Sequence, residues 1–191
     1  ILAQVLFAPR PPPQIAFEMD SYSTRSNTIF CTFVTCLGSC AILSHLTSYH
    51  FEVNPTGTAQ MREITELTKN SYLGADQAIL TFDVDANLES EFNWNCHQLW
   101  VYVVASYTTP KNARNEVVIW DKCIEDVDEA KFSETVQNKY PLRDEFTLLR
   151  GANITLSFRY RQQPITGIVY EKRLGETSFV APEEYFRAKS G

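Results

Sequence analysis

The sequence lacks the residue patterns that catalysis and metal binding most often use. It has three histidines and seven glycines in 191 residues. It contains no G-x-S-x-G nucleophile motif, no glycine-rich phosphate loop and no cysteine or histidine ligand spacing. Asp83-x-Asp85-x-Asn87 begins like an EF-hand loop, but the sixth and twelfth positions are Leu88 and Trp94 instead of Gly and Glu. We therefore expect no catalytic residue, no metal ligand and no cofactor.

The sequence also lacks a basic cluster. Seventeen Lys and Arg residues stand against 23 Asp and Glu residues, for a net charge of −6. Proteins that bind nucleic acid neutralise phosphates with grouped Lys and Arg side chains. This composition argues against nucleic acid as a partner.

Charge is absent altogether from residues 26–51, which read SNTIFCTFVTCLGSCAILSHLTSYHF. A transmembrane helix needs about 20 mostly apolar residues. Three interpretations compete: a cleaved signal peptide cut near Ala41, a signal anchor that stays in the membrane, and a buried helix of a soluble core. The length of the run favours the anchor, and an uncharged helix of this length is unusual in a soluble core.

The flanking charges predict the orientation of this segment. Arg10 and Arg25 precede the run and Glu52 follows it, so the positive-inside rule places residues 1–25 in the cytosol and residues 52–191 across the membrane. Residues 1–18 are proline-rich and precede the first methionine, Met19. We interpret them as a disordered extension or an upstream translated stretch.

Small hydroxyl residues recur along one face of the predicted helix. They are Thr28, Thr32, Thr35 and Ser39. Small residues let helices approach closely in lipid and can hydrogen-bond across an interface, for about 0.6 kcal/mol each. The alternative is that each hydroxyl bonds a carbonyl of its own helix. We favour a helix-packing stripe that contacts a partner helix.

Period-two patterns after residue 51 predict a mainly β domain. Residues 79–88 are the clearest strand, with strict apolar–polar alternation over residues 80–88, and residues 153–161 alternate in the same way, as in half-buried strands. Residues 99–108 are nearly all β-branched or aromatic, and residues 116–122 form their expected return strand. Shorter strands are expected at 168–170 and 178–180, and one short helix within 126–140. The sum predicts an antiparallel β-sandwich-like domain, residues 52–191, on a single N-terminal transmembrane helix.

Two features of this domain depend on its compartment. If the hairpin of residues 99–122 is symmetric about Thr109 and Pro110, Cys96 and Cys123 lie opposite one another, so either a disulfide or two free thiols would fit. Asn153-Ile154-Thr155 is a glycosylation sequon on the polar face of its strand, and becomes an acceptor site if the domain is lumenal.

The strongest pattern lies in residues 79–122. It comprises Thr81-Phe82-Asp83, Phe92, Trp94-Asn95, Gln98-Leu99, Asn115, Val117-Val118 and Trp120-Asp121-Lys122. In these residues the chain resembles the signal peptidase complex subunit 3 family, and the similarity extends from about Met19 to Tyr185. Cys96 and Cys123 stand where that family is expected to have aliphatic residues.

The resemblance implies a non-catalytic accessory subunit of the endoplasmic reticulum signal peptidase complex, which removes signal peptides from secretory and membrane proteins. It implies a single-pass type II glycoprotein of that membrane, with its β-domain in the lumen. Its partners would be the catalytic and other accessory subunits and membrane lipid. The alternative is a membrane-anchored lumenal or cell-surface β-sandwich binding module; a lumenal hydrolase finds little support.

Overall fold

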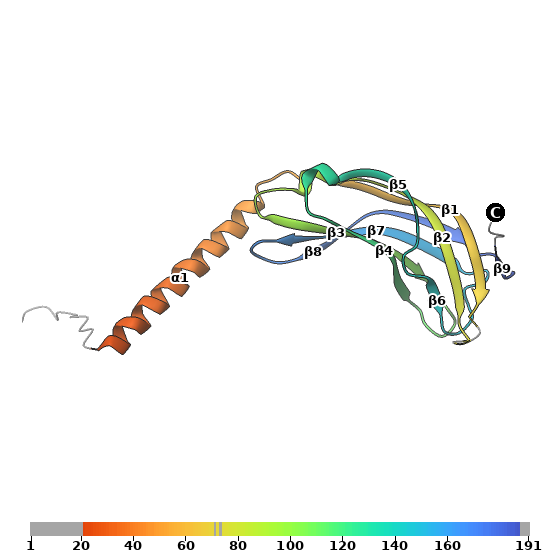
Figure 1. Cartoon of the computed structure of the whole chain (residues 1–191), viewed down its shortest axis with the longest axis horizontal. Helices are drawn as coiled ribbons and strands as arrows, with labels where there is room; N and C mark the ends of the chain where they lie inside the picture. Colours follow the sequence, from red (N-terminus) through yellow and green to blue (C-terminus); the bar gives the residue numbers. More distant parts are fainter. Residues whose placement is uncertain (1–20, 71, 73, 188–191) are drawn as a thin grey trace, which may run out of the picture. The chain divides into compact units, whose positions relative to one another are not determined.

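The computed structural model describes residues 21–70, 72 and 74–187. One helix, α1 (Tyr22–Ser48), precedes a domain of antiparallel strands (Figure 1). Chain contacts define two compact units, residues 1–40 and 41–191. The interpretation of residues 1–18 falls outside the described residues.

Helix α1 begins four residues before the uncharged run and ends three residues before its end. The Ser21 hydroxyl accepts a hydrogen bond from the Thr24 N–H (3.2 Å), as an N-cap does, so the helix extends back through Arg25. At the other end, Tyr49 and His50 donate to carbonyls three residues earlier, which closes the last turn. At about 1.5 Å per residue the helix is about 40 Å long, enough to cross a bilayer core. None of its residues is buried.

The strands form two sheets among the described residues. The first has the order β5-β2-β1-β9, with β6 also pairing with β2, and the second has the order β4-β3-β7-β8. The strands are β1 (Thr56–Lys69), β2 (Asp76–Asn87), β3 (Cys96–Tyr107), β4 (Asn115–Ile124), β5 (Lys131–Gln137), β6 (Leu142–Asp144), β7 (Asn153–Pro164), β8 (Tyr170–Val180) and β9 (Phe186–Arg187). Two short 3-10 helices, Glu89–Glu91 and Val127–Glu129, lie in the connections.

The two sheets form two layers around one hydrophobic core, as Figure 1 shows. The apolar positions of β2 and β7 supply much of it, with Phe82, Phe158 and Tyr160 among the largest fully buried side chains. Inward-facing residues of β3 complete the facing layer. Each large aromatic ring removes 150–250 Å² from water on burial, so these rings contribute much of the driving force.

Strands β1 and β8 approach closely at two glycines. A Cβ on Gly175 would lie 2.6 Å from the carbonyl oxygen of Gly57, and a Cβ on Gly57 would lie 2.5 Å from the Phe158 ring. On the opposite edge, the rings of Trp120 and Phe132 lie 6.5 Å apart. The first contact brings the two sheets together at the β1–β8 edge, and the second brings them together at the β4–β5 edge.

The mainly β architecture on one apolar helix is confirmed. The alternating segments 79–88 and 153–161 lie in β2 and β7, and residues 99–108 and 116–122 lie largely in β3 and β4. The two short strands expected at 168–170 and 178–180 overlap the two ends of a single long strand, β8, so strand was correctly expected at 178–180 but the separation into two strands was wrong. The segment 126–140 contains a strand, β5, in addition to a short helical turn.

The register predicted for the β3–β4 hairpin was also wrong. Cys123 pairs with Trp100, whereas Cys96 lies opposite Pro164 of β7. A register shift between Val103 and Val104 and a loop centred beyond Pro110 break the assumed symmetry. Both cysteines are free thiols, so the geometry that suggested a disulfide is not present.

Candidate functional site

The outer face of the second sheet carries a buried arginine. Arg159 on β7 is 5% exposed, although it lies on the polar side of its strand. Its guanidinium donates to Ser157 Oγ (3.1 Å) and to Glu116 Oε1 of β4 (2.8 Å), and reaches Glu171 Oε1 of β8 at 3.4 Å. Because β7 is an inner strand, carboxylates from β4 and β8 reach it from both sides.

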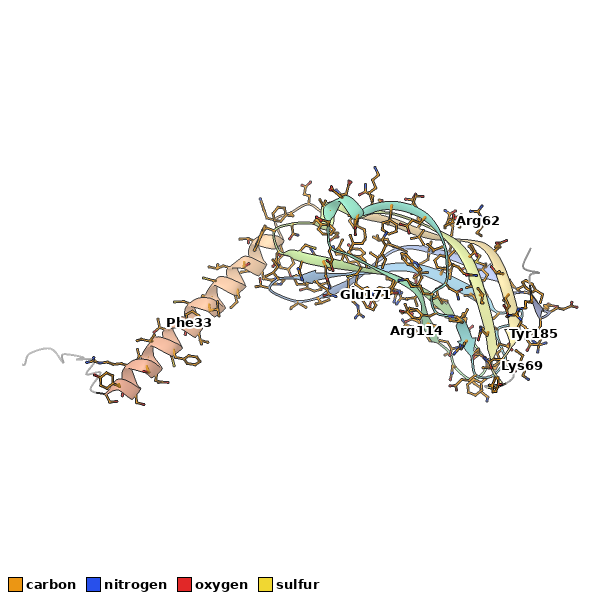
Figure 2. All side chains as sticks on the ribbon, viewed as in Figure 1. Phe33, Arg62, Lys69, Arg114, Glu171 and Tyr185 are labelled. Atoms are coloured by element: carbon orange, nitrogen blue, oxygen red, sulfur yellow. The ribbon has the colours of Figure 1, made fainter. Side chains whose placement is uncertain are left out.

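Further arginines extend this arrangement across the sheet. Arg114 donates to Glu116 Oε1 (2.8 Å), and Arg161 donates to Glu171 Oε2 (2.8 Å). We call the group Arg114, Glu116, Arg159, Arg161 and Glu171 the arginine face. Figure 2 shows Arg114 and Glu171 on the same side of the domain. Hydrogen bonds from Arg159 and then Arg114 lower the pKa of Glu116 to about 2, and hydrogen bonding to Arg161 lowers that of Glu171.

Aromatic rings border the arginine face. Trp100 and Tyr102 of β3 stack with centroids 4.6 Å apart, and the Arg161 guanidinium lies 5.8 Å and 5.9 Å from their centroids. Burial raises the pKa of Tyr102. Arginine and large aromatic residues are enriched where proteins bind other proteins. This face therefore has the composition of a protein-binding surface.

A second charged group lies inside the domain. Glu91 is 1% exposed; it accepts hydrogen bonds from the Tyr160 hydroxyl and from Lys172 Nζ (2.9 Å). Burial and the neighbouring carboxylate raise the pKa of Tyr160 above its usual range. The side chain of Lys172 is 42% exposed and lies beside solvent. Glu91 thus ties the turn after β2 to β7 and β8.

The predicted stripe lies on exposed positions of α1, apart from Thr28, which is half-buried. The hydroxyls of Thr28, Thr35 and Ser39 donate to the carbonyls of the residues four positions earlier, at 2.8–2.9 Å. These bonds are the intrahelical alternative named above. They satisfy the hydroxyls but leave the small side chains accessible, so close approach of a partner helix remains the proposed role.

The predicted glycan acceptor lies on an accessible position. Asn153 is the first residue of β7 and is exposed. Thr155, the third residue of the sequon, exchanges a 2.8 Å hydrogen bond with Ser178 of β8. Cys96 and Cys123, the other predicted site residues, lie on different strands and are not brought together.

The charged clusters of the domain were not predicted. In the sequence, Arg159 is one of several polar residues of an alternating strand. Glu91 is part of a polar connection between strands. The available signal was the presence of opposite charges on three strands, Glu116 on β4, Arg159 on β7 and Glu171 on β8, but their alignment requires the register. Within the described part of the chain, no cluster of His, Cys, Asp and Glu side chains could hold a metal ion.

Comparison with known proteins identifies the family. A family model described as signal peptidase subunit matches residues 19–184. The chain belongs to this family. It is 32% identical over 169 residues to signal peptidase complex subunit 3 of Dictyostelium discoideum, covering 88% of this chain and 98% of that protein. The Gallus gallus protein of the same name is 29% identical over 179 residues, covering 90% and 99%. The Caenorhabditis briggsae protein is 36% identical over 134 residues, covering 69% and 72%.

The signal peptidase subunit match covers both parts described above. It begins before α1 and ends at residue 184, beyond β8, so it includes the apolar helix and nearly the whole β-domain. α1 is the one described helix long and apolar enough to be a candidate membrane span.

Proposed function

We propose that this chain is a non-catalytic accessory subunit of the endoplasmic reticulum signal peptidase complex. It supports the removal of signal peptides from secretory and membrane proteins during translocation. The supporting observation is the signal peptidase subunit match over residues 19–184. Residues 26–51 are the signal anchor, residues 1–25 lie in the cytosol and residues 52–191 form the lumenal domain.

The mechanism we propose is scaffolding. The β-domain supports the lumenal part of the catalytic subunit, and α1 packs against neighbouring transmembrane helices through Thr28, Thr32, Thr35 and Ser39. The arginine face suits the lumenal contact, because its arginines are held in fixed positions by carboxylates and stacked rings. Pre-organised side chains lose little conformational entropy on binding.

Co-purification tests this function. The full chain, tagged and extracted from microsomes in mild detergent, should recover an activity that cleaves signal peptides. Changing Thr32→Leu and Ser39→Leu together should lower the recovered activity several-fold, because two interhelical contacts contribute about 1 kcal/mol in total. Membrane insertion should be unchanged.

The matched control changes the opposite face of the helix. Val34→Leu and Leu37→Ile alter size by little and lie away from the stripe, so recovery should stay at the wild-type level. If the wild-type chain recovers no such activity, the accessory-subunit proposal is wrong and the anchored binding module is favoured. If the stripe variant and the control variant recover equal activity, the helix-packing stripe is rejected, but the accessory-subunit proposal is not.

A glycan on Asn153 would test the topology independently. In the lumen this exposed side chain should carry a glycan, so N-glycosidase treatment should increase the gel mobility of the wild-type chain. Asn153→Gln and Thr155→Ala should both remove the shift. Thr155→Ser preserves the sequon and should retain it. A wild-type chain insensitive to the enzyme would contradict either the lumenal placement or the acceptor.

A further inference from the structure

The loop between β7 and β8 exposes an apolar tip. Residues 165–169 connect the two strands, and Ile165, Ile168 and Val169 are 66%, 61% and 52% exposed. Single exposed apolar side chains are normal on protein surfaces, but a group of three on one tight tip is not. We call residues 165–169 the apolar tip.

Charge is excluded from this end of the hairpin. Residues 162–170 contain no formal charge. The flanking residues Arg161 and Glu171 are opposite one another in the β7–β8 register and form an ion pair at 2.8 Å. The nearest charges on these two strands are therefore at the base of the tip, where they neutralise each other.

The apolar tip is held against the last two turns of α1. Thr166 Oγ1 donates to Ser44 Oγ at 3.3 Å, and the hydroxyls of Tyr49 and Tyr170 lie 2.9 Å apart. A Cβ on Gly167 would overlap the ring of His45, and the φ of Gly167, +117°, is one that other residues rarely adopt. All these residues belong to the compact unit 41–191.

Hydrogen bonds with Asn95 also fix the apolar tip to the β-domain. Asn95, 3% exposed, accepts from the Thr166 N–H at 3.0 Å and donates to the Thr166 carbonyl at 2.9 Å. The Ile165 N–H donates to the Asn95 carbonyl at 2.8 Å. These bonds hold the tip in place, so Ile165 and Ile168 cannot escape solvent by folding back over the domain.

The tip contacts α1 near the C-terminal end of the proposed membrane span. Ser44 lies one turn before the end of α1, about 6 Å along its axis. The headgroup region on each side of a bilayer is about 5–8 Å thick. Tyr49 (61% exposed), Phe51 (44%) and Tyr170 (44%) surround this level, and aromatic residues are enriched where membrane proteins cross the headgroups.

We propose that the apolar tip inserts into the lumenal headgroup–acyl boundary of the membrane and gives the β-domain a second membrane attachment beside α1. The inference rests on the proposed membrane span. An uncharged apolar surface continuous with the end of a spanning helix fits a lipid interface. Two attachments fix the tilt of the domain as well as its height, whereas a helix alone leaves the domain free to rock.

Photocrosslinking in microsomes tests this inference. The photoreactive residue benzoylphenylalanine replaces Ile168 in the full chain, within the assembled complex, and the phospholipids carry a radioactive label. Ile168 is mostly exposed, so the replacement disturbs little packing. The expected result is a labelled lipid adduct. Leu37 on α1, on the face opposite the stripe, is the positive control, and exposed Ser133 on β5 is the negative control.

Each outcome separates this inference from the proposed function. Lipid adducts at Ile168 and Leu37 but not at Ser133 support it. A lipid adduct at Leu37 with only protein adducts, or none, at Ile168 overturns the inference and leaves the membrane span standing. Absence of lipid adducts at both Leu37 and Ile168 overturns the span, and the inference with it.

Discussion

Replacing Glu91 with Ala is expected to destabilise the β-domain by about 1–3 kcal/mol, the range found when a buried polar group loses its hydrogen-bond partner. The substitution leaves the buried Tyr160 hydroxyl without its acceptor. It also leaves Lys172 Nζ without its counter-ion, although this group can turn to water. The measurement is the free energy of unfolding of the full chain in mild detergent, from the midpoint of denaturant unfolding.

Two further variants isolate the hydrogen bond from the charge. Glu91→Gln retains an acceptor for Tyr160 and should cost less than Glu91→Ala. Combined with Tyr160→Phe, Glu91→Ala should cost clearly less than the sum of the two single changes, because the unpaired hydroxyl is gone. Strict additivity would show that the two side chains are not energetically coupled.

The arginine face should make the free energy of unfolding depend on pH below about 4.5. The folded pKa of Glu116, about 2, is below its unfolded value near 4.5, so its pairing stabilises the fold above pH 4.5. That stabilisation, roughly 1–3 kcal/mol after allowance for solvent, is lost as the pH falls from about 4.5 towards 2. The lowered pKa of Glu171 acts in the same direction. Unfolding free energies measured across this range should decrease as the pH falls.

Arg159→Met tests the cause of this dependence. Methionine keeps an apolar stem of similar length but removes the charged hydrogen bonds to Glu116 and Glu171, and should cost about 1–3 kcal/mol at neutral pH. Its stability should fall less steeply between pH 4.5 and 2 than that of the wild-type chain, because Glu116 loses its first stabilising donor. Lys139→Met, which changes a half-exposed lysine paired with Asp121 at 3.3 Å, is the matched control. If the stability of Arg159→Met falls as steeply between pH 4.5 and 2 as that of the wild-type chain, Arg159 is not the cause of the pH dependence.

Strands whose residues alternate between apolar and polar could be located from the sequence. Strands interrupted by β-bulges could not. Strand β2 keeps one register along its length, so Leu80, Phe82 and Val84 fall on one face at spacings of two. Strand β1 carries register shifts after Met61 and after Ile64. Its apolar residues therefore fall at spacings of two and then three, and no strand was predicted there. Strand β5 is a mostly polar edge strand and gives no strong pattern either.

The predicted site residues also divide into those that depend on a local motif and those that depend on the strand register. Asn153 is a local motif, so its exposed position on β7 was predicted. The Cys96–Cys123 disulfide alternative required a symmetric hairpin, and a register shift between Val103 and Val104 together with the loop length instead pairs Cys123 with Trp100. Arg159 was expected on a solvent-facing side, but neighbouring strands and their carboxylates bury it.

The sequence by itself determined the class of this protein: an apolar helix long enough to cross a membrane, followed by a mainly β domain, with the residues that mark its family. These properties follow from the charge, the length and the apolar–polar period of short segments, all of which are local features of the sequence. Tertiary structure alone decided the strand registers, the burial of Glu91 and Arg159, and the contact of the apolar tip with the end of α1. The burial of Glu91 and Arg159 and the contact of the apolar tip depend on residues more than 40 positions apart in the chain, such as Ser44 and Thr166, whose distance is fixed only when the sheets pair and pack.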